Sequence, residues 1–343
     1  MRVSRYKSPY VALAADENVG RPVLPFPSGW FCVGLSRDWK PGALRTCRFF
    51  GSDVVVYRTA SGMLRVTRPH CPHLGAHLGA GGTVDGEFLV CPLHRFAFGA
   101  DGACARTPYG APPRAALELL PAREQYGIVW VWHSVDGSRP TWELPELPEA
   151  THPRTVHGKE LAGHPQDVME TVIDHRRLVE LHGLSSVETL SPPKAVGPFG
   201  SVTYRIGREL SRISTVQEVE VKFLGLGGAL FLIDLPRLRV AQWLLATPVA
   251  SGRLQYRAAA SVVTDLAPRL PVPVRRVLEK ALSFSANRWH VYDARATLPV
   301  LHHKAYVPEP KLTATDAPIG AYRRWARQFY PKGAVELEDD PVM

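Results

Sequence analysis

The sequence predicts an α+β protein of two domains, a small all-β domain followed by a larger domain that mixes helices and strands. Its 343 residues, 45 % of them hydrophobic, are enough to fill two cores. Residues 1–140 contain short β-branched and aromatic runs separated by turn residues, after an N-terminal arm. Residues 154–343 contain long helical and strand-like segments instead.

The strands of the first domain are marked by their composition and by the turns that follow them. Residues 30–33 (WFCV) lead to a Pro-Gly turn at 41–42, and residues 54–57 (VVVY) precede a Ser-Gly turn at 61–62. Residues 127–132 (GIVWVW) close the set. We therefore expect a small sheet structure with its longest loops at one tip.

The second domain follows a linker at residues 141–153, where prolines alternate with acidic residues. After it we expect a helix over residues 166–182, strands from about residue 202 to 263, and a helix from 272 to about 296.

Composition argues against several classes of protein. The longest apolar stretch, residues 223–235, is interrupted by glycines and is too short to span a bilayer, so we expect a buried strand pair there and no transmembrane segment. The net charge of +9 comes from scattered arginines without a basic run and interleaved aromatics, so nucleic-acid binding is not expected. The first residues contain no apolar run typical of a signal peptide.

One motif in the first domain points to redox chemistry. Cys71 and His73 are followed, after seventeen residues, by Cys91 and His94, which gives C-x-H-x17-C-x2-H. In a Rieske [2Fe–2S] cluster two thiolates bind one iron and two imidazoles bind the other. Zinc is the rival interpretation, but zinc sites usually group Cys with Cys and His with His at short spacings. The motif therefore predicts a Rieske cluster and single-electron transfer.

Other residues of this region fit the same prediction. Five cysteines, at least two of them committed to iron, indicate a reducing cytoplasm rather than a disulfide-stabilised secreted protein. Cys104 is expected to be a free buried thiol. Arg68, Arg95 and Arg106 flank the motif and could attract an acidic electron donor.

Two long segments resemble one family. Residues 71–110, CPHLGAHLGAGGTVDGEFLVCPLHRFAFGADGACARTPYG, are similar to the cluster domain of Rieske non-haem iron oxygenases, in particular the cholesterol 7-desaturase and 3-ketosteroid 9α-hydroxylase branch. Residues 304–331, KAYVPEPKLTATDAPIGAYRRWARQFYP, resemble the closing segment of that branch, and residues 247–249 (TPV) also fit. The resemblance covers nearly the whole chain and implies that the second domain is a helix-grip unit.

The resemblance also implies a mononuclear Fe(II) site with two histidines and a carboxylate. The family pattern is roughly E-N-x-x-D-x-x-H-x-x-x-x-H. Asp174 falls on the acid that links this site to a neighbouring subunit's cluster, and His182 falls on the second histidine. Arg177 stands at the first histidine position. Thr297 stands at the carboxylate position, seven residues before Lys304.

These two replacements leave alternatives open. A variant iron set could consist of His182, His175 and Asp293, although His175 is about 200° from Arg177 around a helix and Asp293 lies one helical turn before Thr297. Each of the three also has an ordinary interpretation, as an exposed helix residue, a core histidine and an ion-pair partner. Arg177 either repels a metal or binds an anionic group of a substrate.

Two functions follow from the resemblance. In the first, the chain is an O₂-dependent oxygenase or desaturase that receives electrons from a ferredoxin or flavin reductase, acts on a sterol-like or other polycyclic apolar substrate, and forms a head-to-tail homotrimer. In the second, it is a divergent member without the mononuclear iron that serves as an electron carrier, a binding protein or a partner subunit.

Overall fold

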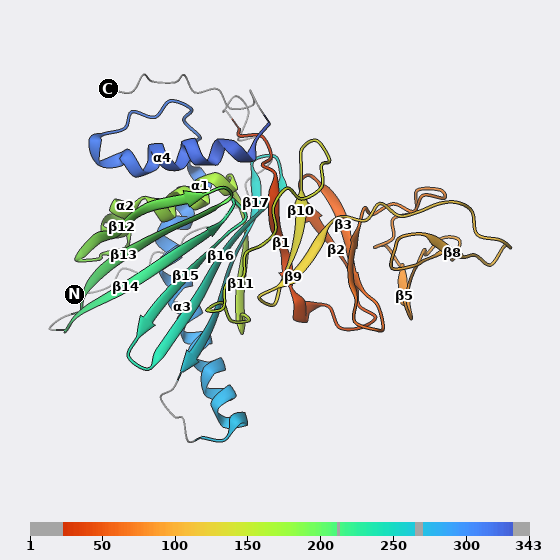
Figure 1. Cartoon of the computed structure of the whole chain (residues 1–343), viewed down its shortest axis with the longest axis horizontal. Coiled ribbons are helices and arrows are strands. Elements are labelled where there is room, and N and C mark those ends of the chain that lie inside the picture. The colour runs from red at the N-terminus through yellow and green to blue at the C-terminus, as the bar shows by residue number, and fades with distance from the viewer. Residues whose placement is uncertain (1–22, 211–212, 265–269, 332–343) are drawn as a thin grey trace.

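A computed structural model describes residues 23–210, 213–264 and 270–331, and shows an elongated molecule made of two domains (Figure 1). The first domain contains short strands, whereas the second pairs a large antiparallel sheet with helices. The predicted α+β class is confirmed. Within the described ranges, no helix combines the length and the hydrophobicity needed to cross a membrane.

The first domain consists of three small antiparallel sheets, ordered β1-β10-β9, β2-β3-β4 and β5-β6-β7-β8. The expected strands at residues 30–33, 54–57 and 127–132 fall in β1, β3 and β10. The sheet that contains β5 and β8 lies at the outer end of the molecule (Figure 1). The strands are β1 (Gly29–Leu35), β2 (Leu44–Phe49), β3 (Ser52–Arg58), β4 (Leu64–Thr67), β5 (Thr83–Asp85), β6 (Phe88–Val90), β7 (Ala97–Phe98), β8 (Cys104–Arg106), β9 (Ala122–Gln125) and β10 (Ile128–His133).

The second domain is built on one seven-stranded antiparallel sheet, ordered β11-β17-β16-β15-β14-β13-β12. The long helix α3 packs against β11 and β17, and α4 packs against α1 and β12 (Figure 1). The strands are β11 (Thr155–Ala162), β12 (Ser186–Val196), β13 (Phe199–Leu210), β14 (Ile213–Leu224), β15 (Gly228–Leu235), β16 (Leu238–Ala250) and β17 (Arg253–Thr264). The helices are α1 (Pro165–Ile173), α2 (His175–His182), α3 (Val272–His303) and α4 (Ala317–Ala326).

Three expectations for this domain are refined by the structure. The single helix expected over residues 166–182 is two helices, because Asp174 leaves the helical conformation (φ −75°, ψ 83°) and its carboxylate caps α2 by accepting from the Arg177 amide at 3.2 Å. The last helix continues past residue 296 to His303. The apolar stretch 223–235 forms the end of β14, a turn and β15, as expected for a strand pair.

A shared core fixes the two domains relative to each other. Trp30 and Trp130 of the first domain pack in one buried cluster with Trp243 of the second. The Thr247 hydroxyl donates to the Cys32 carbonyl at 2.6 Å across the same boundary. Residues 134–154, which include the predicted linker, contain no helix or strand. The linker therefore crosses a packed interface and does not act as a hinge between independent bodies.

A buried ionic network ties the closing segment to the helices beside the sheet. Glu170 of α1 accepts from Lys304 at 2.7 Å and from Arg323 of α4 at 2.6 Å. Burial by itself would raise the pKa of Glu170, but the two cations outweigh burial and the pKa is lowered. Breaking such a pair by removing one partner costs about 3–5 kcal/mol. The network therefore fixes α1, α4 and the C-terminal end of α3 relative to one another.

Candidate functional site

Two loops at the outer tip of the first domain share one backbone geometry. In the first loop the Cys71 amide donates to the Ala76 carbonyl at 2.8 Å, and the Gly75 amide donates to the Cys71 carbonyl at 2.9 Å. The second loop repeats both bonds from Cys91, at 2.8 and 3.1 Å. The fourth residue after each cysteine has a positive φ, 72° at Gly75 and 57° at Arg95. The loops are thus two copies of the same turn.

Within these turns the predicted ligands form two pairs of donors. Cys71 and Cys91 are only 2 % and 1 % exposed, whereas His73 lies at the surface and its ring centroid is 4.8 Å from that of His94. Burial raises the pKa of the Cys71 thiol to about 11, and the adjacent Cys91 thiol adds to the rise. Two buried sulfurs behind two outer imidazoles suit a Rieske cluster.

The pairing of donors at the tip favours the cluster over zinc. Each turn contributes one cysteine and one histidine, whereas zinc sites usually group like ligands at short spacings. All five cysteines are free, and Cys104 is buried as expected.

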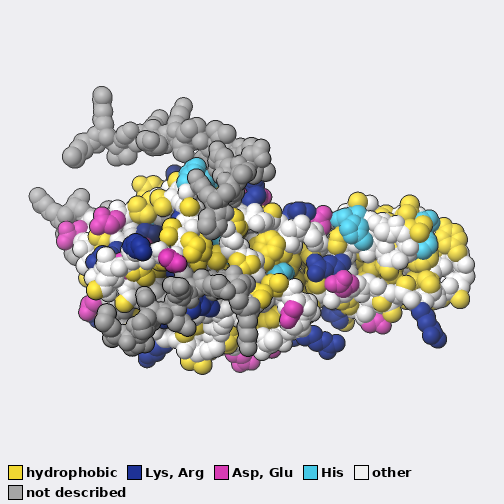
Figure 2. Space-filling model, turned by 90° about the horizontal axis from the view of Figure 1, so that it is seen from above, with side chains coloured by type: hydrophobic (Ala, Val, Ile, Leu, Met, Phe, Trp, Pro, Cys, Tyr) yellow, Lys and Arg dark blue, Asp and Glu magenta, His cyan; other side chains and the backbone are white. Residues whose placement is uncertain are grey.

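The three arginines near this tip differ in their partners. Arg68 pairs with Glu118 at 3.2 Å, and Arg106 pairs with Asp85. Arg95 is exposed and, among the described residues, forms no ion pair. Figure 2 shows histidine side chains gathered at this end of the molecule. Because Arg68 and Arg106 are paired with acidic residues, Arg95 is the arginine of the three that is left to attract an acidic electron donor.

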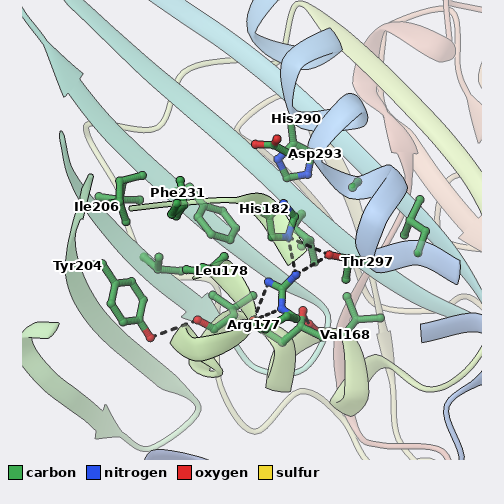
Figure 3. Close-up of a pocket in the computed structure, with 18 of the residues that line it drawn as sticks. Val168, Arg177, Leu178, His182, Tyr204, Ile206, Phe231, His290, Asp293 and Thr297 are labelled. Carbon is green, nitrogen blue, oxygen red and sulfur yellow. Dashed lines mark hydrogen bonds between the residues drawn. The ribbon is translucent and has the colours of Figure 1, made fainter. Parts of the chain in front are cut away.

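The second domain contains a cavity of about 180 Å³ between the sheet and helices α1, α2 and α3 (Figure 3). Its walls are mostly apolar. Its polar side chains include Arg177 and His182 from α2, and Asp293 and Thr297 from α3. The apolar lining includes Val168, Leu178, Ile206, Phe231, Leu244 and Leu298.

Arg177 occupies the centre of the polar group in this cavity (Figure 3). Its Nη1 lies 2.9 Å from His182 Nε2 and also donates to the Thr297 hydroxyl. The Thr297 hydroxyl is in turn 3.0 Å from His182 Nε2. Nε and Nη2 both donate to the Thr171 carbonyl, at 3.1 and 2.8 Å. The two residues that replace expected iron ligands are therefore hydrogen-bonded to each other and to the histidine that remains.

The electrostatics of this group oppose a metal. Burial lowers the pKa of His182, and the Arg177 guanidinium lowers it further, with Asp293 acting in the opposite direction. A guanidinium stays protonated in proteins and has no lone pair to offer. A cation in direct contact with the remaining imidazole repels Fe²⁺ and removes the lone pair that would bind it. At the three positions where the resemblance implies iron ligands, only His182 can bind a metal.

Of the variant ligand set, His182 and Asp293 line the cavity, whereas His175 does not. His175 does not line the cavity, because two residues along α2 turn its side chain about 200° away from Arg177. Asp293 does line the cavity, but its carboxylate pairs with Arg208 at 3.3 Å. Asp174, the expected electron-transfer bridge, is half-buried and caps α2.

Two cavity residues were not identified from the sequence. His290 Nε2 lies 2.9 Å from the Tyr256 hydroxyl, and burial, with smaller contributions from His182 and Arg177, lowers the pKa of His290 to about 4. Arg208 of β13 neutralises Asp293. The sequence did contain a pattern that could have identified His290. His290, Asp293 and Thr297 are spaced i, i+3, i+7, so they share one face of a helix. No local signal identifies Arg208, which is 85 residues away from its partner.

Comparisons with known proteins agree with both halves of this description. Residues 29–122 match the Rieske [2Fe-2S] domain family, and residues 131–330 match the 3-ketosteroid 9alpha-hydroxylase C-terminal domain family. A cholesterol 7-desaturase from Bombyx mori is 28 % identical, over 92 % of this chain and 72 % of its own length. A probable 3-ketosteroid-9-alpha-monooxygenase oxygenase component from Rhodococcus rhodochrous is 26 % identical, over 94 % of this chain and 83 % of its own.

Solved structures show the same fold at lower identity. Dicamba monooxygenase bound to dicamba superposes with a TM-score of 0.61 at 14 % identity, covering 89 % of this chain and 98 % of its own. NdmB from Pseudomonas putida CBB5 gives a TM-score of 0.64 at 17 % identity, covering 87 % of this chain and 89 % of its own. The predicted resemblance, the oxidoreductase class and the Rieske cofactor are confirmed. A complete pair of cluster loops in front of a sheet-and-helix domain that matches over 131–330 shows that the chain belongs to the Rieske oxygenase family, in the group with the 3-ketosteroid 9α-hydroxylase type of C-terminal domain.

Proposed function

We propose that the chain is a Rieske-type oxidoreductase that serves an oxygenase or desaturase reaction on a sterol-like polycyclic molecule. The observation that carries the proposal is the duplicated turn, which supports Cys71, His73, Cys91 and His94 as the ligands of a [2Fe–2S] cluster. When bound, the cluster supplies a one-electron couple. His73 is exposed, so we propose that electrons enter and leave on the histidine side of the tip.

The proposed substrate class is supported by the apolar cavity and by the relatives named as cholesterol and ketosteroid enzymes. The cavity of about 180 Å³ is little larger than one of about 150 Å³ that binds benzene. A four-ring skeleton needs more room than this. We therefore propose that wall residues such as Phe231 and Ile233 move when the substrate enters.

Electron delivery is proposed to require a second copy of the chain. The cluster loops belong to the outer end of the first domain, where β5 and β8 lie (Figure 1). The cavity lies in the second domain, between its sheet and helices α1, α2 and α3. In a head-to-tail homotrimer the tip of one subunit would lie beside Asp174 of the next. A ferredoxin or flavin reductase is the proposed electron donor. The five free cysteines favour the reducing cytoplasm as the location.

A second candidate function is favoured by Arg177. Its guanidinium contacts His182 and Thr297 at the position where the family holds iron, so this chain would take electrons without activating O₂ itself. It would then act as an electron carrier, a binding protein or a partner subunit of an active oxygenase.

The experiment that tests the proposal is iron and acid-labile sulfide analysis of anaerobically purified protein, with EPR spectroscopy of the reduced form. About two irons and two sulfides with a Rieske signal support the cluster. Turnover of a sterol with O₂, a ferredoxin and its reductase then separates the candidates, because only the first predicts product from this chain alone. Protein that lacks both sulfide and the Rieske signal after reconstitution with iron and sulfide would contradict the proposal.

A further inference from the structure

We propose that Arg177 binds an anionic group of the molecule that fills the second-domain cavity, so that a family iron-ligand position has become an anion-recognition site. The inference rests on the proposed function in one respect, namely that an apolar ligand occupies this cavity. It adds a chemical requirement, because the ligand must have a carboxylate or a similar anion at one end of an apolar body.

The Arg177 guanidinium has no charged hydrogen-bond partner. All of its hydrogen-bond partners are neutral, namely the Thr171 backbone carbonyl, the His182 imidazole and the Thr297 hydroxyl. Among the described residues, no carboxylate forms an ion pair with it. Asp174 accepts only from the Arg177 backbone amide. The Asp174 carboxylate raises the pKa of Arg177 through its charge, without a hydrogen bond to the guanidinium. A ligand anion in direct contact would offset more of the cost of burying this cation.

The second argument is the charge count of the cavity wall. The charged side chains that line it are Arg177, Arg208 and Asp293. Arg208 and Asp293 neutralise each other at 3.3 Å, so one positive charge remains. Burial lowers the pKa of both His182 and His290, which keeps these imidazoles neutral. An anion is therefore the ligand charge that balances the charged side chains lining the cavity.

Arg177 also has a hydrogen-bond donor that is not used within the described part of the chain. A guanidinium has five N–H groups. Nη1 uses two of them, on His182 and Thr297, while Nε and Nη2 each use one on the Thr171 carbonyl. The second N–H of Nη2 has no acceptor in the described part of the chain. A carboxylate that accepts this N–H would form a charge-assisted bond, whereas a sterol hydroxyl would leave the charge unbalanced.

The test compares a steroid that has a side-chain carboxylate with its methyl ester, which keeps the skeleton and removes the charge. Dissociation constants are measured by calorimetry at pH 7.5 on the full-length protein. We expect the acid to bind about 10- to 100-fold more tightly than the ester, since a hydrogen bond to a charged group contributes about 1.5–3 kcal/mol. Arg177→Gln should bring the ratio to about 1 with the ester affinity kept, and Arg177→Lys should restore part of it.

A matched control is Arg205→Gln. Arg205 lies on β13, its side chain is 42 % exposed, and it pairs with Glu188 and Glu218. This variant lowers the net charge by the same amount and should keep the full ratio. Equal binding of acid and ester by the unaltered protein would overturn the anion site and leave the proposed apolar ligand intact. A ratio unchanged in Arg177→Gln would do the same, and no binding of either probe would overturn both.

Discussion

The two domains of this molecule differ in how many of the expected ligand residues they contain. At the tip of the first domain, all four proposed cluster ligands lie on a duplicated turn, with two sulfurs buried and His73 at the surface. In the second domain only His182 stands at an expected ligand position, and Arg177 and Thr297 bond to it and to each other. The residue set proposed for electron storage is therefore complete, whereas the set expected for oxygen activation is replaced at two of three positions.

The scaffold around this site does not depend on a ligand in the cavity. Glu170, Lys304 and Arg323 hold α1, α4 and the C-terminal end of α3 together within the same domain. Arg177 and Thr297 occupy facing positions on α2 and α3, so their hydrogen bond joins two helices that this network already positions.

The largest effect is expected at the tip of the first domain, where one substitution should remove the cluster and with it the difference between the two domains. Cys71→Ser removes one of two thiolates on an iron, so we expect loss of the cluster, with iron falling from about two per chain to near zero. Iron analysis and EPR spectroscopy of the reduced protein measure this loss. Cys104→Ser is the control, because Cys104 is buried nearby but outside the motif. Equal iron in the two variants would refute the ligand assignment.

The second-largest effect is expected in the second domain, where two substitutions should supply the iron ligands that are missing there. The double variant Arg177→His, Thr297→Asp supplies an imidazole and a carboxylate beside His182, and should bind about one additional Fe²⁺ per chain. Iron is counted after anaerobic loading and desalting. Arg176→His with Ala296→Asp makes the same changes at exposed neighbouring positions, and it should gain none. A double variant that holds no more iron than this control would show that the family geometry has been lost.

The smallest effect concerns pH and the second domain alone. Burial lowers the pKa of His290 to about 4, against about 6.5 in an unfolded chain. The unfolded state therefore binds more protons between these values, so the free energy of unfolding falls as the pH drops from 6.5 towards 4. His290→Gln should flatten this dependence by up to about 3 kcal/mol, measured by urea unfolding at several pH values.

His133 and His164 have lowered pKa values for the same reason, so the variant removes only the share that belongs to His290. His157→Gln, on an exposed stretch of β11, is the control and should leave the slope unchanged. A slope that is equally steep in His290→Gln would mean that this imidazole does not titrate as its burial implies.

Sequence reasoning succeeded where the determining residues are close together in the chain. The strands of the first domain are marked by their own turns, and the motif within 24 residues was enough to predict the Rieske domain. It failed at the break between α1 and α2, because Asp174 caps a new helix inside a continuous helical pattern. It also could not give the Arg208 to Asp293 pair or the bond from Arg177 to Thr297, since each joins elements that only tertiary packing brings together.

Because the Arg177 charge is covalently attached, the two domains should respond differently to oxygen and to chelators. An iron ion can be extracted by a chelator or oxidised in air, whereas a guanidinium can be neither removed nor oxidised under those conditions. Exposure to oxygen and chelators should therefore bleach the tip and leave ligand binding in the second domain intact. A preparation that has lost its colour would still hold its ligand, so absorbance alone would undercount the binding-competent protein.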